Sequence, residues 1–192
     1  MVTRLDQVTT IEWQSMVAAN GKQQRNPADA LISMLRLSDG FFVFEADHLT
    51  HQLQTATRAL EAGADDELVL GALFHDVGEI VAGPSHAMIA ATLLRPYVRP
   101  DVFNIVRTHQ DFQGRYYNAH IGLNEDAYLE HSDQPWFDLA LTFSEDWDQC
   151  SFDPSYATKS LDYFLPMVER MLATASYGTT PNSDESARPS DV

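Results

Sequence analysis

A His-Asp doublet is the feature of this sequence with the clearest chemical meaning. His75 and Asp76 follow the apolar run 68–74, so the pair is expected at the end of a buried helix. A carboxylate is almost never fully buried unless it is paired or bound to a metal, so the doublet requires a partner. On these residues alone, a His-Asp hydrogen bond at a helix end explains the pair as well as a metal site does.

Further His and Asp residues, placed on other expected helices, favour the metal site. Together they form the ordered series His51, His75, Asp76, His86, His109 and Asp148. Imidazole and carboxylate ligands together suit Fe, Mn, Co or Zn, whereas a Mg²⁺ site is built mostly from oxygen. Taken singly, each of these residues has a structural explanation, so the argument rests on the whole series.

This series resembles the HD-domain superfamily, all-helical metal-dependent proteins named after their His-Asp doublet. The minimal family pattern, His…His-Asp…Asp, is matched in order by His51, His75, Asp76 and Asp148. Members with two metals add two His between the doublet and the last Asp, and His86 and His109 occupy those positions. The resemblance covers about residues 45–165.

The resemblance implies an all-α fold, a single HD-domain helical bundle with a dinuclear metal site in its centre. It implies that Asp76 bridges the two metals. One metal would be held by His51, His75 and Asp148, and the other by His86 and His109. Asp146 competes for the last position, but Asp148 is preferred because the family's ligand follows an aromatic residue, here Trp147.

Within the superfamily, the set of four His and two Asp resembles that of the mixed-valence di-iron oxygenases, such as myo-inositol oxygenase and the hydroxyalkylphosphonate oxygenases. This resemblance implies two iron ions, Fe(II)/Fe(III), and O₂-dependent cleavage of a carbon–carbon or carbon–heteroatom bond in a small hydroxylated substrate. The alternative is an HD phosphohydrolase that acts on a nucleotide or phosphate ester with Mn, Co or Ni. A degenerate HD module for binding or signalling is the non-enzymatic alternative.

Several polar residues near the series are candidates for contact with substrate. The predicted catalytic residues are Asp76 and Glu79, and the predicted substrate-binding residues are Glu45, Glu79, Gln113 and Arg115. Phosphonate-cleaving relatives carry basic residues where this chain has Glu79, Gln113 and residues 144–146, so a polyol, amino alcohol or cationic small molecule is favoured. The alternative is that Glu79 is merely exposed and does not contact the substrate. Residues 41–45 occupy the place of a gating loop, in which only Glu45 would supply the carboxylate.

Three histidines lie outside the series. His48 is one turn before His51 and is either close to the ligands or exposed, with exposure the expectation. His120 and His131 lie in the polar segment 113–133, which is expected to be a loop or short helix, and are not expected to be ligands. Residues 111–117 follow His109 directly and either cover the open face of the site or form a surface loop.

The elements that must position these residues are helices nearly throughout, with no convincing strand. The expected helices are 27–37, 47–63, 67–76, 85–94, 100–111, 136–148 and 161–175. Asn26, Asp47, Asp65 and Ser85 are at positions to cap helix N-termini, and Gly63 is expected to stop a helix.

Composition indicates one domain, since 192 residues with 44% hydrophobic content can bury a sizeable core. Residues 1–177 are predicted to form the domain and 178–192, which lack periodicity, a disordered tail. The formal charge of −16 disfavours nucleic acid and anionic membranes as partners. No apolar run approaches the ~20 residues needed to span a bilayer, and no signal sequence is evident. The single Cys150 cannot form an internal disulfide. We therefore expect a cytoplasmic protein whose partners are a small-molecule substrate and O₂.

Overall fold

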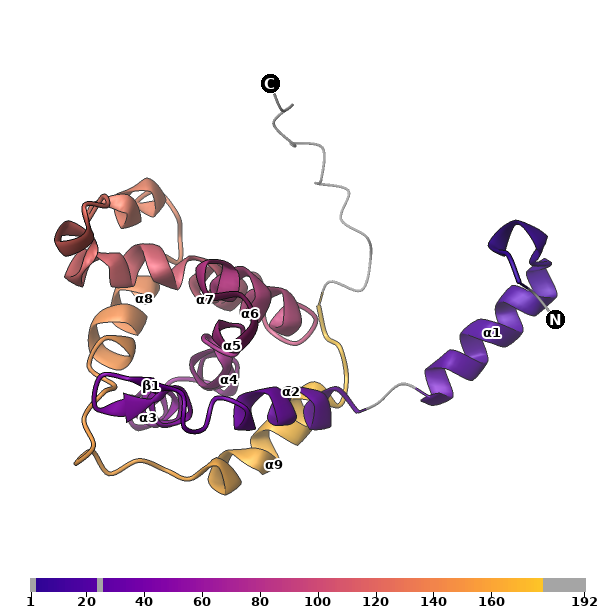
Figure 1. Ribbon diagram of the computed structural model, residues 1–192, viewed down its shortest axis with the longest axis horizontal. Coiled ribbons are helices and arrows are strands. Elements are labelled where there is room, and N and C mark those ends of the chain that lie inside the picture. The colour runs from indigo at the N-terminus through magenta and orange to yellow at the C-terminus, as the bar shows by residue number, and fades with distance from the viewer. Residues whose placement is uncertain (1–2, 24–25, 178–192) are drawn as a thin grey trace.

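The computed structural model describes residues 3–23 and 26–177, which are mostly helical (Figure 1). The helices are α1 Thr10–Gln23, α2 Pro27–Arg36, α3 His48–Glu61, α4 Asp66–Phe74, α5 Glu79–Ala82, α6 His86–Leu94, α7 Pro100–Gln113, α8 Phe137–Thr142 and α9 Leu161–Leu172. The all-α prediction is confirmed. The predicted tail, 178–192, lies outside the described residues.

Helix α4 forms the centre of the bundle. Every side chain from residue 68 to residue 74 is buried, as expected for a helix that is apolar on all sides. Helices α3, α6, α7 and α9 pack around it. At Gly71 a Cβ atom would lie 3.0 Å from Val102, so this glycine permits the close approach of α4 and α7.

Three of the four expected N-caps are confirmed. The side chains of Asn26, Asp47 and Asp65 accept hydrogen bonds from main-chain N–H groups at the starts of α2, α3 and α4. The expectation for Ser85 is wrong, because the 3₁₀ helix Gly83–Ser85 leads directly into α6. The Ser85 backbone (φ −114°, ψ 8°) therefore lacks the extended geometry in which a cap accepts. Gly63, with φ +79°, ends α3 as expected.

Several boundaries differ from the sequence prediction. The helix expected to reach Asp76 ends at Phe74, and α8 continues into a π-helical turn, Phe143–Asp148. Segment 113–133 contains the short 3₁₀ helices Gly114–Tyr116, Asn118–Ile121 and Ala127–His131. The expectation of no strand is wrong for one small hairpin, in which β1 Phe42–Val43 pairs antiparallel with β2 Ala46–Asp47.

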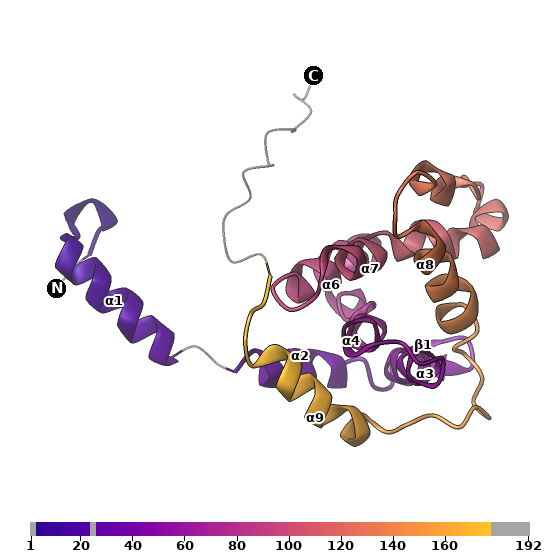
Figure 2. The ribbon, with the colours of Figure 1, turned by 180° about the vertical axis from the view of Figure 1, so that it is seen from behind.

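Helix α1 was not predicted, although the sequence carries its start signal. Thr9 and Glu12 form a capping box: the Thr9 hydroxyl accepts from the Glu12 N–H, and the Glu12 carboxylate accepts from the Thr9 N–H. In both ribbon views α1 projects away from the bundle (Figures 1 and 2). Its apolar side chains, including Ile11 and Trp13, are exposed.

No single helix in the described ranges is long and apolar enough to cross a membrane. One pair, Asp66–Phe74 with Glu79–Leu94, passes the same length and composition test together, with a bend of 41° between its parts.

Candidate metal centre

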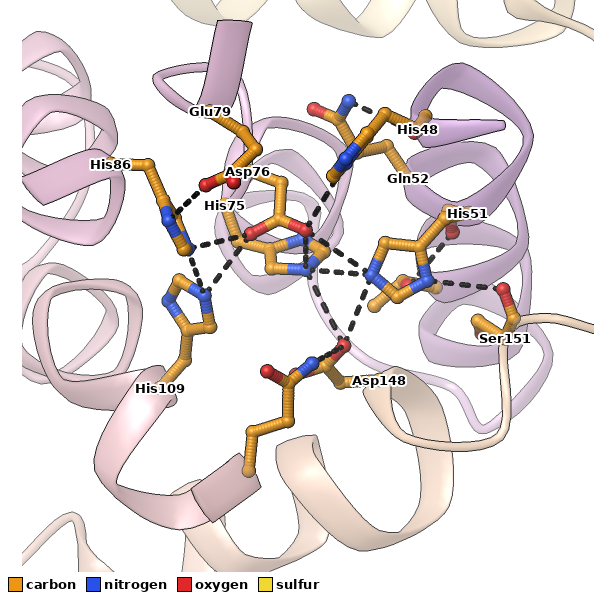
Figure 3. Close-up of polar contacts among 12 residues, drawn as sticks. His48, His51, Gln52, His75, Asp76, Glu79, His86, His109, Asp148 and Ser151 are labelled. Carbon is orange, nitrogen blue, oxygen red and sulfur yellow. Dashed lines mark hydrogen bonds and ion pairs between the residues drawn. The ribbon is translucent and has the colours of Figure 1, made fainter. Parts of the chain in front are cut away.

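The structure brings all six residues of the predicted ligand series together (Figure 3). They come from the first turns of α3, the segment after α4, the first residue of α6, the last turn of α7 and the π-helical turn. All six are buried: His51, His75, Asp76, His86, His109 and Asp148. Gly78 makes this convergence possible, because a Cβ atom there would lie 2.7 Å from the main-chain oxygen of His86.

Each of the four imidazoles in this cluster bonds a main-chain carbonyl through Nδ1. The acceptors are Ser151 O for His51 (3.0 Å), Ala72 O for His75 (2.9 Å), Gly83 O for His86 (2.6 Å) and Val106 O for His109 (2.7 Å). A carbonyl only accepts, so Nδ1 carries the hydrogen in every ring. In the neutral imidazole, Nε2 is then left with a free lone pair.

The four Nε2 atoms face one another in two pairs. His51 and His75 place theirs 3.2 Å apart, and His86 and His109 place theirs 3.0 Å apart. Two lone pairs at this distance repel unless a cation or proton lies between them. An outer nitrogen fixed by a carbonyl and an inner nitrogen free to coordinate is the arrangement that metal-ligating histidines adopt. The side chains present therefore fit bound metal ions.

Asp76 lies between the two imidazole pairs. Its Oδ1 is 3.0 Å from Nε2 of His86 and 3.1 Å from Nε2 of His109. Its Oδ2 is 3.4 Å from Nε2 of both His51 and His75. One carboxylate oxygen thus faces each pair, which is the placement that a bridging ligand requires.

Asp148 completes the half of the cluster formed by His51 and His75. Its Oδ1 lies 3.1 Å and 3.4 Å from their Nε2 atoms, while its buried Oδ2 has no hydrogen-bond partner within the described ranges. Asp146, the competing residue, is exposed. Ligand atoms of His51, His75 and Asp148, and likewise of His75, Asp76 and His109, lie within 4.8 Å of one another and could hold metal ions.

In the absence of a metal, the carboxylates and imidazoles of the cluster shift one another's pKa values strongly. Burial alone lowers the pKa of His51, but hydrogen bonds to Asp148 and Asp76 outweigh it and raise that pKa to about 10. Burial likewise opposes the effect of Asp76 on His86, whose pKa is raised to about 9. Burial raises the pKa values of Asp76 and Asp148, yet the adjacent histidines hold both well below the usual range. Both carboxylates are therefore ionised, and in the metal-free cluster they are balanced by the protons that His51 and His86 retain.

The predicted contact residues separate into two groups. Glu79 and Gln113 lie at the site: the Glu79 carboxylate contacts Nδ1 of His86, and the Gln113 amide donates to Asp148 at 3.3 Å. Glu45 and Arg115 do not line the cavity beside the cluster. Glu45 is exposed in the turn of the β1–β2 hairpin. The Arg115 guanidinium is held over the ring of Tyr128, with 4.9 Å to the ring centroid.

The expectation that His48 is exposed is wrong. Its side chain is buried, stacks on the Phe41 ring (centroids 4.8 Å apart) and directs Nδ1 toward Asp76 Oδ2 at 3.9 Å. Spacing carried a signal for this placement, because residues i and i+3 share a helix face and His51 is a buried neighbour. His131 bonds Asp111 at 2.8 Å outside the cluster.

A cavity of about 670 Å³ opens beside the cluster. Its lining residues are Phe44, His48, His51, Asp76, Glu79, Gly83, Pro84, His86, Gln110, Gln113, Tyr116, Tyr117, Gln149 and Phe152. This volume is in the range of small-molecule binding sites. Phe152 stacks on His51 with centroids 4.3 Å apart, and Phe44 packs edge-on against Phe152.

The comparison with protein families matches the HD domain over residues 48–145, slightly more than half of the chain. The chain therefore belongs to the HD domain family, whose members are generally metal-dependent enzymes. The match ends before Asp148, which the structure adds to the buried cluster. A comparison with curated proteins finds no match.

Proposed function

We propose that this protein is a mixed-valence di-iron oxygenase of the HD family. Its reaction would use O₂ to cleave a carbon–carbon or carbon–heteroatom bond in a small hydroxylated substrate. His51, His75 and Asp148 would hold one iron, His86 and His109 the other, and Asp76 would bridge them. Two bound iron ions would supply the redox chemistry that the side chains lack.

The observation that carries this proposal is the chemistry of the cavity beside the ligands. No Lys or Arg occurs among its described lining residues. Enzymes that transfer or hydrolyse phosphoryl groups use cationic side chains as well as metals to balance the charge of the phosphate oxygens. The cavity therefore gives no support to the phosphohydrolase alternative, whereas a hydroxylated substrate needs no such cation.

The chain's own residues have distinct parts in this proposal. Glu79 orients His86 through Nδ1, and Gln113 holds Asp148 in place. Phe152 stacks on one face of the His51 ring and shields that face. The partners would be the small-molecule substrate and O₂, with no nucleic acid or membrane.

The proposal is tested by purifying the protein anaerobically with iron and oxidising it partially. We expect an EPR signal below the free-electron g value, from a coupled Fe(II)/Fe(III) pair, which changes when a substrate hydroxyl is added. Turnover should consume O₂ and stop under argon. Anaerobic release of phosphate from nucleotides or phosphate esters, supported by Mn, Co or Ni and abolished in Asp148→Ala, would instead establish the phosphohydrolase.

A further inference from the structure

His48 offers the cavity a polar atom that the protein itself does not use. The side chain is more than nine-tenths buried and lines the cavity. Among the residues that the structure describes, its Nδ1 has no hydrogen-bond partner, and the 3.9 Å to Asp76 Oδ2 is too long for a hydrogen bond. Leaving a buried polar atom unpaired costs about 1–3 kcal/mol, so a bound group that pairs with it is favoured.

The ring of His48 is fixed toward this position. Phe41 stacks on it with an interplanar angle of 13°, and the His48 main-chain N–H donates to the Phe41 carbonyl at 2.9 Å. The nearby Gln52 amide donates to the His48 carbonyl at 3.0 Å. The stack with Phe41 therefore orients the imidazole, and the two main-chain bonds hold the start of α3 that carries it.

Apart from the carboxylates of Asp76 and Glu79 and the histidines of the site, the cavity is lined by aromatic and uncharged residues. Phe44, Tyr116, Tyr117 and Phe152 supply aromatic surface, and the amides of Gln110, Gln113 and Gln149 supply hydrogen-bonding groups. Burial, and to a smaller extent the carboxylates of Asp148, Asp76 and Glu79, raise the pKa of Tyr117. Bound metal ions would make the ligand cluster itself net positive, but no Lys or Arg occurs among the described lining residues.

The two guanidinium groups near the site do not line the cavity. Arg115 lies over the Tyr116 and Tyr128 rings, at 5.4 Å and 4.9 Å from their centroids, and its buried Nη1 has no hydrogen-bond partner among the described residues. Arg58 stacks on Tyr156 and donates to the Cys150 carbonyl. An anionic group on the outer part of a ligand would therefore meet aromatic and amide surface without a counter-charge.

We propose that the cavity binds a hydroxylated molecule with an apolar body and no anionic group on that body, and that His48 hydrogen-bonds its hydroxyl. A hydroxyl both donates and accepts, so it satisfies Nδ1 in either tautomer. This substrate class makes the function proposed above more specific, and it rests on that proposal and on the same site. The role of His48 is that of a residue that touches the ligand.

The test compares probes that share a hydroxyl head group. 1-Phenyl-1,2-ethanediol has the apolar body, 4-(1,2-dihydroxyethyl)benzoate adds a carboxylate to that body, and glycerol lacks the body. Binding is measured by isothermal titration calorimetry on zinc-loaded full-length protein. We expect the phenyl diol to bind at least tenfold more tightly than either of the other two probes, which is a difference in binding free energy of about 1.4 kcal/mol. Equal or tighter binding of the benzoate, or no binding of the phenyl diol, overturns the substrate class.

Variants test the wall and His48 separately. Gln149→Lys places a cation in the cavity and should improve binding of the benzoate severalfold. His48→Phe keeps the ring stack but removes the nitrogen, and should weaken binding of the phenyl diol at least tenfold with unchanged metal content. His48→Asn restores a polar atom near the Nδ1 position and should recover most of that loss. The exposed His120→Phe is the matched control.

The outcomes separate this inference from the oxygenase proposal. Undiminished binding in His48→Phe, confirmed as folded by circular dichroism, overturns the role of His48. If the phenyl diol binds as expected but iron-loaded protein consumes no O₂ with any hydroxylated probe, the oxygenase proposal fails and the inference stands. If O₂ is consumed only with anionic probes, the oxygenase proposal stands and the inference fails.

Discussion

The imidazole of His51 donates through Nδ1 to the main-chain carbonyl of Ser151 at 3.0 Å, across a sequence separation of 100 residues. Asp148, at the end of the preceding π-helical turn, contacts the opposite nitrogen of the same ring. Phe152 then stacks on its face. Segment 148–152 therefore both supplies a carboxylate and fixes the orientation of an imidazole carried by α3.

The placement of Asp76 between two imidazole pairs predicts the metal stoichiometry. Protein expressed with iron should contain close to two ions per chain by elemental analysis. His86→Ala or His109→Ala should lose one ion with the fold retained, because each leaves the other half of the cluster intact. Asp76→Ala should lose both, since its two oxygens face both halves. A wild-type value of one in metal-replete protein contradicts a dinuclear site.

Contact between Glu79 and Nδ1 of His86 predicts a role in metal affinity. Removing an outer partner of a ligating histidine typically costs 10–100-fold in metal affinity. Glu79→Gln should therefore weaken binding of one of the two ions by about tenfold, measured by competition with a chelator. Glu145→Gln, a change at an exposed carboxylate, is the matched control. If the two variants bind metal with equal affinity, Glu79 has no part in holding His86.

The raised pKa values predict that metal-free protein loses stability as the pH rises. The pKa values of His51 and His86 are raised from 6.5 to about 10 and about 9, so above pH 6.5 the folded state keeps protons that the unfolded state releases. Their stabilisation is complete below pH 6.5 and is lost as the pH rises through 9 and 10. Melting temperatures of chelator-treated protein should fall across this window.

Metal-loaded protein is the control for this pH dependence. Metal binding displaces the imidazole protons, so the loaded protein should show a much flatter profile between pH 7 and 10. A melting temperature of the metal-free protein that rises with pH in this window would contradict the proton linkage of the two histidines.

The close approach at Gly78 predicts a specific effect of a methyl group there. Gly78→Ala would place Cβ 2.7 Å from the main-chain oxygen of His86 and push α6 away from the doublet. Overpacking of this kind costs about 1–3 kcal/mol, and it should also remove the ion that His86 holds. Val168→Ala, at a buried position of α9, should lower stability with the metal content unchanged. If Gly78→Ala retains two ions, the contact does not position His86.

The sequence alone predicts the all-α fold and the identity of the buried cluster. The run 68–74 has no polar side, so its helix has to be buried, and the doublet that follows is carried into the interior. Asn26, Asp47 and Asp65 mark helix starts through short-range hydrogen bonds that depend only on neighbouring residues.

Tertiary structure decides which other polar residues belong to the site. His48, expected to be exposed, is buried because α3 places it one turn from His51 and Phe41 covers it. Glu45 and Arg115, expected at the substrate, are directed elsewhere by a hairpin turn and by tyrosine rings. Glu79 reaches the imidazole of His86 only because the chain turns sharply after the doublet.

There is a physical reason why some features can be predicted from the sequence and others only from the tertiary structure. Apolar periodicity and helix caps depend on neighbouring residues, and the order of the predicted ligands depends only on their order in the chain. All three can therefore be read without knowledge of the packing. Whether a loop side chain points into a cavity depends on contacts between segments as distant as His51 and Ser151. The sequence by itself thus predicted the helices of the bundle and the six residues of the buried cluster. Only the packing of α3 and α7 against the π-helical turn, and of α6 against α7, decided the cavity and its walls.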